Sequence, residues 1–156
     1  MKVDSYDIPE NCYYVKEHEW IFIEDDGTAR IGITDYAQKA LREITYFYAG
    51  TRGAEIGRME TICKIESVKS VAEIMSPLTG RVIRFNNRLF DNPSLINDDP
   101  YGEGWIATIR PAKPDKELEK LLKPEAYAEH ITELTKIDET LLIHRWKKVM
   151  EEEAGE

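Results

Sequence analysis

Short stretches in which apolar and polar residues alternate, separated by turn residues, fill most of the first two-thirds of the sequence. The clearest is Glu19–Thr34, where two alternating segments flank Asp26-Gly27, a dipeptide typical of β-hairpin turns. Further short segments of this kind lie at 45–57, 62–76, 81–86 and 104–111. Many short strands with frequent turns predict a mainly β (α+β) fold, built as a small barrel or sandwich.

One helix is predicted among these strands. Thr34 is a good N-cap, and it precedes a segment in which apolar residues recur at helical spacing. These apolar residues are Ala37, Ala40, Leu41 and Ile44.

The sequence after Pro111 is charged and helical in pattern. Asp115, Pro124 and Asp138 are residues that favour helix starts, so three helices are predicted there. The second carries an apolar stripe of Tyr127, Ile131 and Leu134, and we expect it to pack on the β-structure. The third carries a stripe of Leu142, Trp146, Val149 and Met150. We expect this stripe also to pack on the β-structure, with docking of a partner as the alternative, and we expect the final residues to fray.

The composition excludes several classes of partner. A formal net charge of −9 disfavours nucleic acid and anionic membranes, which both select basic surfaces. No apolar run is long enough to span a bilayer and no signal peptide is evident, so we expect a cytoplasmic protein. The two cysteines and three histidines are scattered, which predicts neither a disulfide framework nor a metal site.

Lys69 lies at the predicted reversal of a hairpin within Cys63–Gly80. Alternation places Cys63, Ile65 and Ser67 on one face of the incoming strand, and Ile62, Lys64 and Glu66 on the other. On the outgoing strand, Val71 and Glu73 oppose Ala72 and Ile74. The Lys69 amine should therefore project into water from the hairpin tip.

Three interpretations of Lys69 are open from the residues alone. An exposed lysine on a turn is commonly a solubility residue. A protruding lysine between small side chains, here Ser67 and Ser70, also suits an enzyme that acylates it. A catalytic Schiff-base lysine would need desolvation, which a hairpin tip does not provide.

Four motifs in order, spanning about residues 10 to 130, resemble the H protein family of the glycine cleavage system. They are Tyr14–Trp20, Gly32–Leu41, Glu66–Val82 and Asn97–Ile106. The resemblance implies a flattened barrel-sandwich hybrid of the lipoyl/biotinyl-carrier type with flanking helices. It also implies lipoate in amide linkage to Lys69.

The resemblance further implies a carrier that is not an enzyme, with no catalytic residue and no metal. A lipoate-protein ligase or lipoyltransferase would attach the cofactor, and the residues around Lys69 would serve its recognition. Glycine decarboxylase, an aminomethyltransferase and dihydrolipoamide dehydrogenase would be the partners. The recognition residues are Glu66, Ser67, Val68, Ser70 and Glu73, with Glu66 and Glu73 flanking the tip symmetrically.

Two departures from the family pattern favour an alternative. Arg42-Glu43 replaces a Gly-Asp pair, and Tyr46 and Tyr48 add aromatics to the strand that follows. The second departure is the tail from about Thr132, because the family normally ends soon after the preceding helix. We therefore predict a lipoyl domain at 1–131 and a C-terminal helical extension at 132–156, frayed at its end. The alternative is a lipoate-binding protein that carries sulfur intermediates for a heterodisulfide-reductase-like complex in sulfur oxidation.

Three other residues have weaker predicted roles. Cys63 should be a buried structural thiol, and a redox role toward the sulfurs of the arm is the minor alternative. Cys12 is expected to be exposed, with a sulfur-handling role only a speculation. His18 lies between two glutamates and is expected at the surface, with cargo contact implied by the family position alone.

Overall fold

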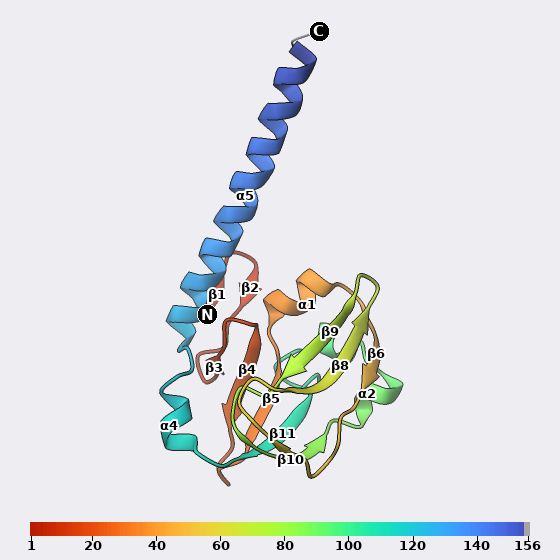
Figure 1. Ribbon diagram of the computed structural model, residues 1–156, viewed down its shortest axis with the longest axis vertical. Coiled ribbons are helices and arrows are strands. Elements are labelled where there is room, and N and C mark those ends of the chain that lie inside the picture. Colours follow the sequence, from red (N-terminus) through yellow and green to blue (C-terminus); the bar gives the residue numbers. More distant parts are fainter. Residues whose placement is uncertain (155–156) are drawn as a thin grey trace.

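Two antiparallel sheets form the body of the protein (Figure 1). The computed structural model describes residues 1–154, without the side chains at 142, 145, 146, 149, 153 and 154. The larger sheet contains, in spatial order, β3 (Tyr13–Tyr14), β4 (Glu19–Ile23), β5 (Ala29–Ile33), β11 (Ala107–Pro111), β10 (Gly80–Phe85) and β7 (Glu55–Ile56). The smaller contains β6 (Ile44–Tyr48), β8 (Thr61–Ser67) and β9 (Val71–Met75).

Five helices and a small ribbon complete the described chain. The ribbon pairs β1 (Lys2–Val3) with β2 (Tyr6–Asp7). The helices are α1 (Asp35–Leu41), α2 (Arg88–Asp91), α3 (Leu95–Asp98), α4 (Pro114–Leu118) and α5 (Pro124–Ala154).

The hairpin predicted at Glu19–Thr34 is confirmed as β4 and β5. Gly27 adopts a φ of +85°, a conformation that favours glycine. The Asp26 carboxylate closes the turn, because it accepts hydrogen bonds from the Thr28 N–H and hydroxyl at 3.0 and 2.6 Å. Local turn chemistry therefore determines the register of this pair.

The core lies between the two sheets. Ile21 and Ile31 of the larger sheet and Ile65 and Ile74 of the smaller belong to one buried cluster. Complete burial of each such side chain contributes about 1.5–3 kcal/mol, so contact between the sheets is the main stabilising force. The predicted α+β fold class is confirmed, because two facing sheets with flanking helices form a sandwich.

The N-terminal end of α5 covers the outer side of the larger sheet. Tyr127 and Ile131 of α5 are buried with Trp20 and Tyr14, and the Tyr14 and Tyr127 rings stack at 4.6 Å. The predicted packing of the stripe that contains Tyr127 and Ile131 is confirmed. Beyond this contact, α5 leaves the body and extends far from it (Figure 1).

The predicted cap of α1 is confirmed, but its predicted apolar stripe is partly wrong. Thr34 Oγ1 accepts a hydrogen bond from the Ala37 N–H at 3.2 Å. The helix ends at Leu41, where Arg42 turns to a φ of +66°. Ala40 is exposed, and Ile44 lies beyond the end of the helix, in β6.

Two predicted helix starts are wrong. The helix near Asp115 begins at Pro114, and no turn interrupts α5 at Asp138. A good capping residue does not end a helix that is already propagating, because only the first turn lacks hydrogen-bond partners. Leu142, Trp146 and Val149 of the stripe predicted after Asp138 lie outside the described side chains. The predicted packing of this stripe is wrong for Met150, which is exposed. Glu151–Ala154 are helical, and the last two residues lie outside the described range.

None of the described helices combines the length and apolarity needed to cross a membrane.

Candidate functional site

Lys69 lies in the turn between β8 and β9, which projects beside α1 (Figure 1). Val68, Lys69 and Ser70 are all exposed. None of the three has a positive φ, so this turn does not require glycine or asparagine. The primary amine of Lys69 forms no ion pair with any described residue, and it lies where an approaching enzyme can reach it.

The buried hydroxyl of Ser67 organises the turn. Ser67 Oγ accepts hydrogen bonds from the Lys69 and Ser70 N–H groups, both at 3.1 Å, and donates to the Ser70 carbonyl at 3.1 Å. The Ser67 N–H also donates to the Ser70 carbonyl at 2.8 Å. A side chain therefore performs the task for which short hairpins commonly use Asn-Gly.

A backbone contact ties the turn to the neighbouring strand. The Val68 N–H donates to the Glu43 carbonyl at 3.0 Å, just before β6 begins. The backbone of the tip is thus restrained on both sides, while the Lys69 side chain remains in solvent. A rigid support for one mobile amine is the arrangement that site-selective modification requires.

The two faces of β8 mostly follow the predicted alternation. Cys63, Ile65 and Ser67 are buried, Lys64 is exposed and Glu66 is half-buried. The prediction for Ile62 is wrong, because this side chain is buried rather than sharing the outer face with Lys64. A register shift between Thr61 and Cys63 causes the difference, since a bulge interrupts alternation.

The prediction that Glu66 and Glu73 flank the tip symmetrically is wrong. Glu66 pairs with Val71 in the row nearest the turn, whereas Glu73 pairs with Lys64 in the next. Lys64 Nζ lies 4.0 Å from the Glu73 carboxylate, and both groups are exposed. The site therefore has one carboxylate, Glu66, close to the turn, and a second, Glu73, that lies farther away and close to Lys64.

Glu19 is a buried carboxyl group that the sequence reasoning missed. It belongs to β4, it is 3% exposed, and its Oε1 has no hydrogen-bond partner among the described residues. Burial, with a smaller contribution from Glu17, raises the pKa of Glu19 to about 8, and the Met75 backbone partly offsets this. The sequence contained a weak signal of this burial, because alternation places Glu19 on the same strand face as the apolar Ile21.

His18 is not the surface residue that was expected. It is half-buried with a φ of +78°, and its Nδ1 lies 2.8 Å from the Tyr127 hydroxyl, which lies 2.7 Å from Thr34 Oγ1. Burial and the nearby His130 lower the pKa of His18 to about 4, so its ring is neutral at physiological pH. This network joins the residue before β4, the N-cap of α1 and a residue of α5, and it gives His18 a structural role.

Both cysteines are buried free thiols. The expected exposure of Cys12 is wrong, because it packs beneath α5, and burial raises its pKa to about 11. Cys63 is inward-facing as predicted, and burial also raises its pKa. Neither residue forms a thiolate near neutral pH, so neither has the chemistry of a redox partner. The described residues also contain no group of three or more His, Cys, Asp or Glu side chains placed to hold a metal.

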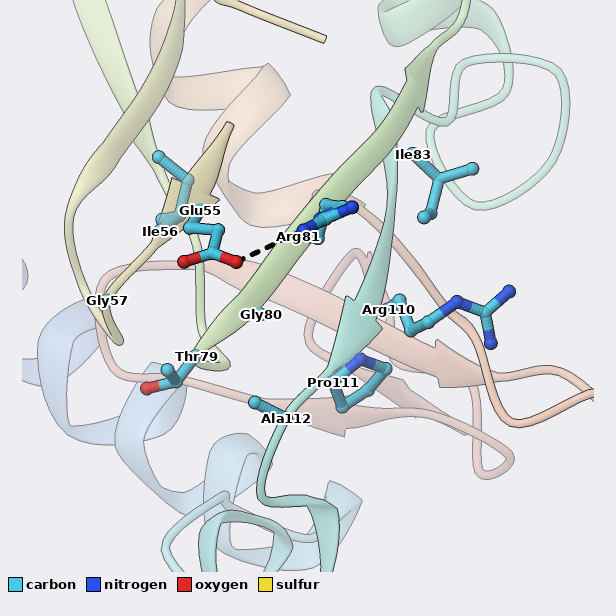
Figure 2. Close-up of a pocket in the computed structure, with 10 residues that line it drawn as sticks. All are labelled: Glu55, Ile56, Gly57, Thr79, Gly80, Arg81, Ile83, Arg110, Pro111 and Ala112. Carbon is cyan, nitrogen blue, oxygen red and sulfur yellow. Dashed lines mark hydrogen bonds and ion pairs between the residues drawn. The ribbon is translucent and has the colours of Figure 1, made fainter. Parts of the chain in front are cut away.

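A groove of about 620 Å³ lies along β10, β11 and β7 (Figure 2). Arg81 and Arg110 line it, and Arg81 is engaged with the Glu55 carboxylate at 3.2 Å. Figure 2 shows Arg110 extending away from this pair. Lys69 is not among the residues that line the groove, so it is separate from the candidate site.

The fold and the hairpin define a class of protein. The scaffold is a lipoyl-carrier sandwich, and an accessible amine projects from one of its hairpins. Carriers of this class present a covalent group to other enzymes and need no catalytic cleft of their own.

Comparison with known proteins identifies the family within this class. The family model described as "Glycine cleavage H-protein" matches residues 12–134. Proteins named "Probable glycine cleavage system H protein" from Thermococcus gammatolerans and Pyrococcus abyssi are 45% and 46% identical over 134 residues. Each alignment covers 86% of this chain and 99% of the relative.

A solved structure agrees with the sequence matches. The glycine cleavage system H protein from Mycobacterium marinum superposes with a TM-score of 0.71 at 30% identity, covering 80% of this chain and 99% of that one. The chain belongs to the glycine cleavage H-protein family. Members of this family are non-catalytic lipoyl carriers, so the prediction of a carrier rather than an enzyme is confirmed.

Proposed function

We propose that this chain is the carrier that glycine decarboxylase loads and an aminomethyltransferase unloads, with Lys69 as the attachment point for lipoate. Dihydrolipoamide dehydrogenase is the third proposed partner, and a lipoate-protein ligase or lipoyltransferase is the attaching enzyme. The observation that supports this proposal is the exposed Lys69 amine on a turn held by Ser67. We also propose that the protein works in the cytoplasm.

The residues at the tip fit the attached group. An amide bond to Lys69 needs an accessible amine, and Lys69 is exposed without a described ion pair. The small Ser70 leaves room on one side, and Ser67 keeps the backbone fixed while the side chain moves. Bound lipoate supplies a disulfide that opens on reduction to a dithiol able to hold cargo. Tethering raises the effective concentration of that dithiol at each partner.

The recognition residues remain part of the proposal. Glu66 and Glu73 lie at different distances from the turn, so we expect replacement of Glu66 by glutamine to slow attachment more than the same change at Glu73. Val68 and Ser70 flank the lysine and would contact the attaching enzyme directly. The division into a carrier domain at 1–131 and an extension at 132–156 also stays a proposal.

Intact mass tests the attachment site. The chain is co-expressed with a lipoate-protein ligase, and we expect one lipoyl increment. Lys69→Arg should abolish the increment. Lys64→Arg is the matched control, because Lys64 is an exposed lysine on the same hairpin, and this variant should retain the increment. An increment that persists in Lys69→Arg, or no increment in the wild type, would contradict the proposal.

A second assay tests the pathway. The lipoylated protein is mixed with glycine decarboxylase and glycine, and reduction of the disulfide is followed. No observation of this structure favours the sulfur-oxidation alternative, which stays a prediction from the sequence. The buried thiols of Cys12 and Cys63 offer it no support.

A further inference from the structure

Arginine side chains gather on the outer face of the larger sheet. Arg81 is opposite Arg110 in the pairing of β10 with β11, and Arg84 is opposite Thr108, which is opposite Arg30 of β5. Residues directly opposite each other in antiparallel strands share a face, and so do residues two positions apart on one strand. Arg30, Arg81, Arg84 and Arg110 therefore lie on one face, which is named here the arginine face.

The arginine face is on the opposite side of the larger sheet from the Lys69 hairpin. Ile31, Val82 and Ile109 alternate with the arginines along their strands, and they belong to the core cluster between the two sheets. The smaller sheet, which carries Lys69, packs on that inner side. On the outer side, α5 covers only the part of the sheet around Trp20. The outer surface of β10 and β11 consequently has no helix over it among the described residues.

Two members of the arginine face have no acidic partner. Arg30 and Arg81 each form an ion pair with a glutamate, at 3.0 and 3.2 Å. Arg84 and Arg110 are exposed, and neither forms an ion pair with any residue that the structure describes. Hydrogen bonds within the β4–β5 turn, and to a smaller degree the charges of Arg110 and Arg84, lower the pKa of Asp26. The two guanidinium groups therefore lie near this turn while their hydrogen-bond donors stay available.

This grouping of charge is unfavourable in the isolated protein. Like charges directly opposite each other in a sheet repel, and Arg81 faces Arg110 in this way. The chain has a net charge of −9, so solubility does not require positive charge to be concentrated on one face, and most surfaces intersperse both signs. Every cation of the arginine face is arginine, whose planar guanidinium binds carboxylates with two parallel hydrogen bonds. A bound partner with carboxylates would offset the repulsion.

The groove along β7, β10 and β11 adds an apolar component to this surface. Its lining includes Ile56, Ile83 and Pro111 together with Arg81 and Arg110 (Figure 2). Arg84 adjoins the groove, because it follows Ile83 on β10. An extended peptide points successive side chains in opposite directions, so it can place apolar side chains in the groove and carboxylates on the arginines.

We propose that the arginine face and its groove bind an acidic segment of another protein, with carboxylates on Arg84 and Arg110 and apolar side chains in the groove. A protein segment fits better than nucleic acid, because the net charge of −9 repels a polyphosphate. This inference goes beyond the proposed function and does not depend on it. A partner held on this side leaves the Lys69 turn free for acylation and for transfer of cargo.

Binding of a short labelled peptide tests the proposal. In the probe glutamate alternates with leucine, and fluorescence anisotropy at low ionic strength measures its Kd. Arg84→Gln/Arg110→Gln should weaken binding about tenfold, because each exposed ion pair contributes up to about 1 kcal/mol and tenfold corresponds to about 1.4 kcal/mol. Lys147→Gln/Lys148→Gln is the matched control, since it makes the same change in net charge at exposed positions of α5. The control variant should bind the probe as the wild type does.

Two further peptides test the chemistry of the segment. A peptide in which lysine replaces glutamate should not bind, and one made of glutamate alone should bind more weakly than the probe. Added salt should weaken binding of the probe, because ions screen the exposed charges. Equal binding of the lysine peptide, no binding of the probe to the wild type, or equal binding by the double arginine variant would each overturn the proposal.

Other occupants of the arginine face give different results. Displacement of the probe by an equal concentration of inorganic phosphate would indicate a site for small anions. A light-scattering mass that rises with protein concentration, and stays monomeric in the double arginine variant, would indicate contact between copies of this chain. Either result would overturn the acidic segment of another protein as the occupant.

Two controls separate the proposal from folding and from the proposed function. Arg84 and Arg110 are exposed and lack a described ion pair, so their replacement should not lower the urea midpoint. Lipoylation should leave the Kd of the probe unchanged, because Lys69 is on the other side of the protein. Failure of lipoylation would refute the proposed function without affecting this measurement, and a Kd that changed on lipoylation would refute the independence of the two sites.

Discussion

Replacement of Glu19 by glutamine should remove a large part of the pH dependence of stability. In the folded protein the pKa of Glu19 is about 8, compared with about 4.5 for an unhindered glutamate. The unfolded chain therefore releases this proton at lower pH than the folded one. The stability linked to this group is fully present below about pH 4.5 and is lost as the pH rises through about 8.

The magnitude follows from the shift in pKa. Each unit corresponds to about 1.4 kcal/mol, so ionisation of Glu19 should cost roughly 4 kcal/mol between about pH 5 and pH 9. Glutamine has nearly the same shape but does not ionise. The free energy of unfolding of Glu19→Gln minus that of the wild type should therefore increase by roughly 4 kcal/mol between about pH 5 and pH 9.

Urea unfolding, followed by tryptophan fluorescence at about pH 5, 7 and 9, measures the difference. Other titrating groups are shared by both proteins, so they cancel in the comparison. Glu10→Gln is the control, because Glu10 is exposed, and its difference from the wild type should stay flat. A flat difference for Glu19→Gln as well would refute the reasoning, since it would show that the carboxyl group ionises without cost.

Three further predictions test the turn, the helix contact and the extension. Ser67→Ala should lower the free energy of unfolding by about 1–3 kcal/mol, because the Lys69 and Ser70 N–H groups lose their acceptor. The same change should slow lipoylation, and unchanged lipoylation kinetics would argue against a positioning role for Ser67. Tyr127→Phe should cost about 1–3 kcal/mol in urea unfolding, because His18 and Thr34 lose a buried partner; no loss would mean that water replaces the hydroxyl. Deletion of residues 137–156 should shift Tm by only a few degrees in calorimetry, because the described apolar side chains of that segment are exposed; a large fall would show that the segment packs on the body.

Some features were predictable because they depend on neighbouring residues. Asp26-Gly27 specified a hairpin turn, and Thr34 specified the start of α1. The position of Lys69 at a strand reversal followed from alternation on both sides. Each of these is an interaction over a few residues, so composition and spacing were sufficient to predict it.

Other features depended on residues that only the folded chain brings together. The inward position of Ile62 follows from a bulge that pairing with β9 imposes, and the burial of Cys12 follows from packing under α5. His18 meets Tyr127 across 109 positions of sequence, and Glu19 is buried near Met75 and Cys63 of the second sheet. The row of Tyr46, Glu66 and Val71 is equally non-local, since strand register alone brings these three residues together.

The sequence by itself determined the strand-rich class, the main hairpin turns and the lysine at the tip, because local conformational preferences act within a few residues. Tertiary structure decided which side chains are buried, which pKa values shift and which exposed residues form one surface. These properties depend on what covers each residue, and the covering elements come from distant parts of the chain.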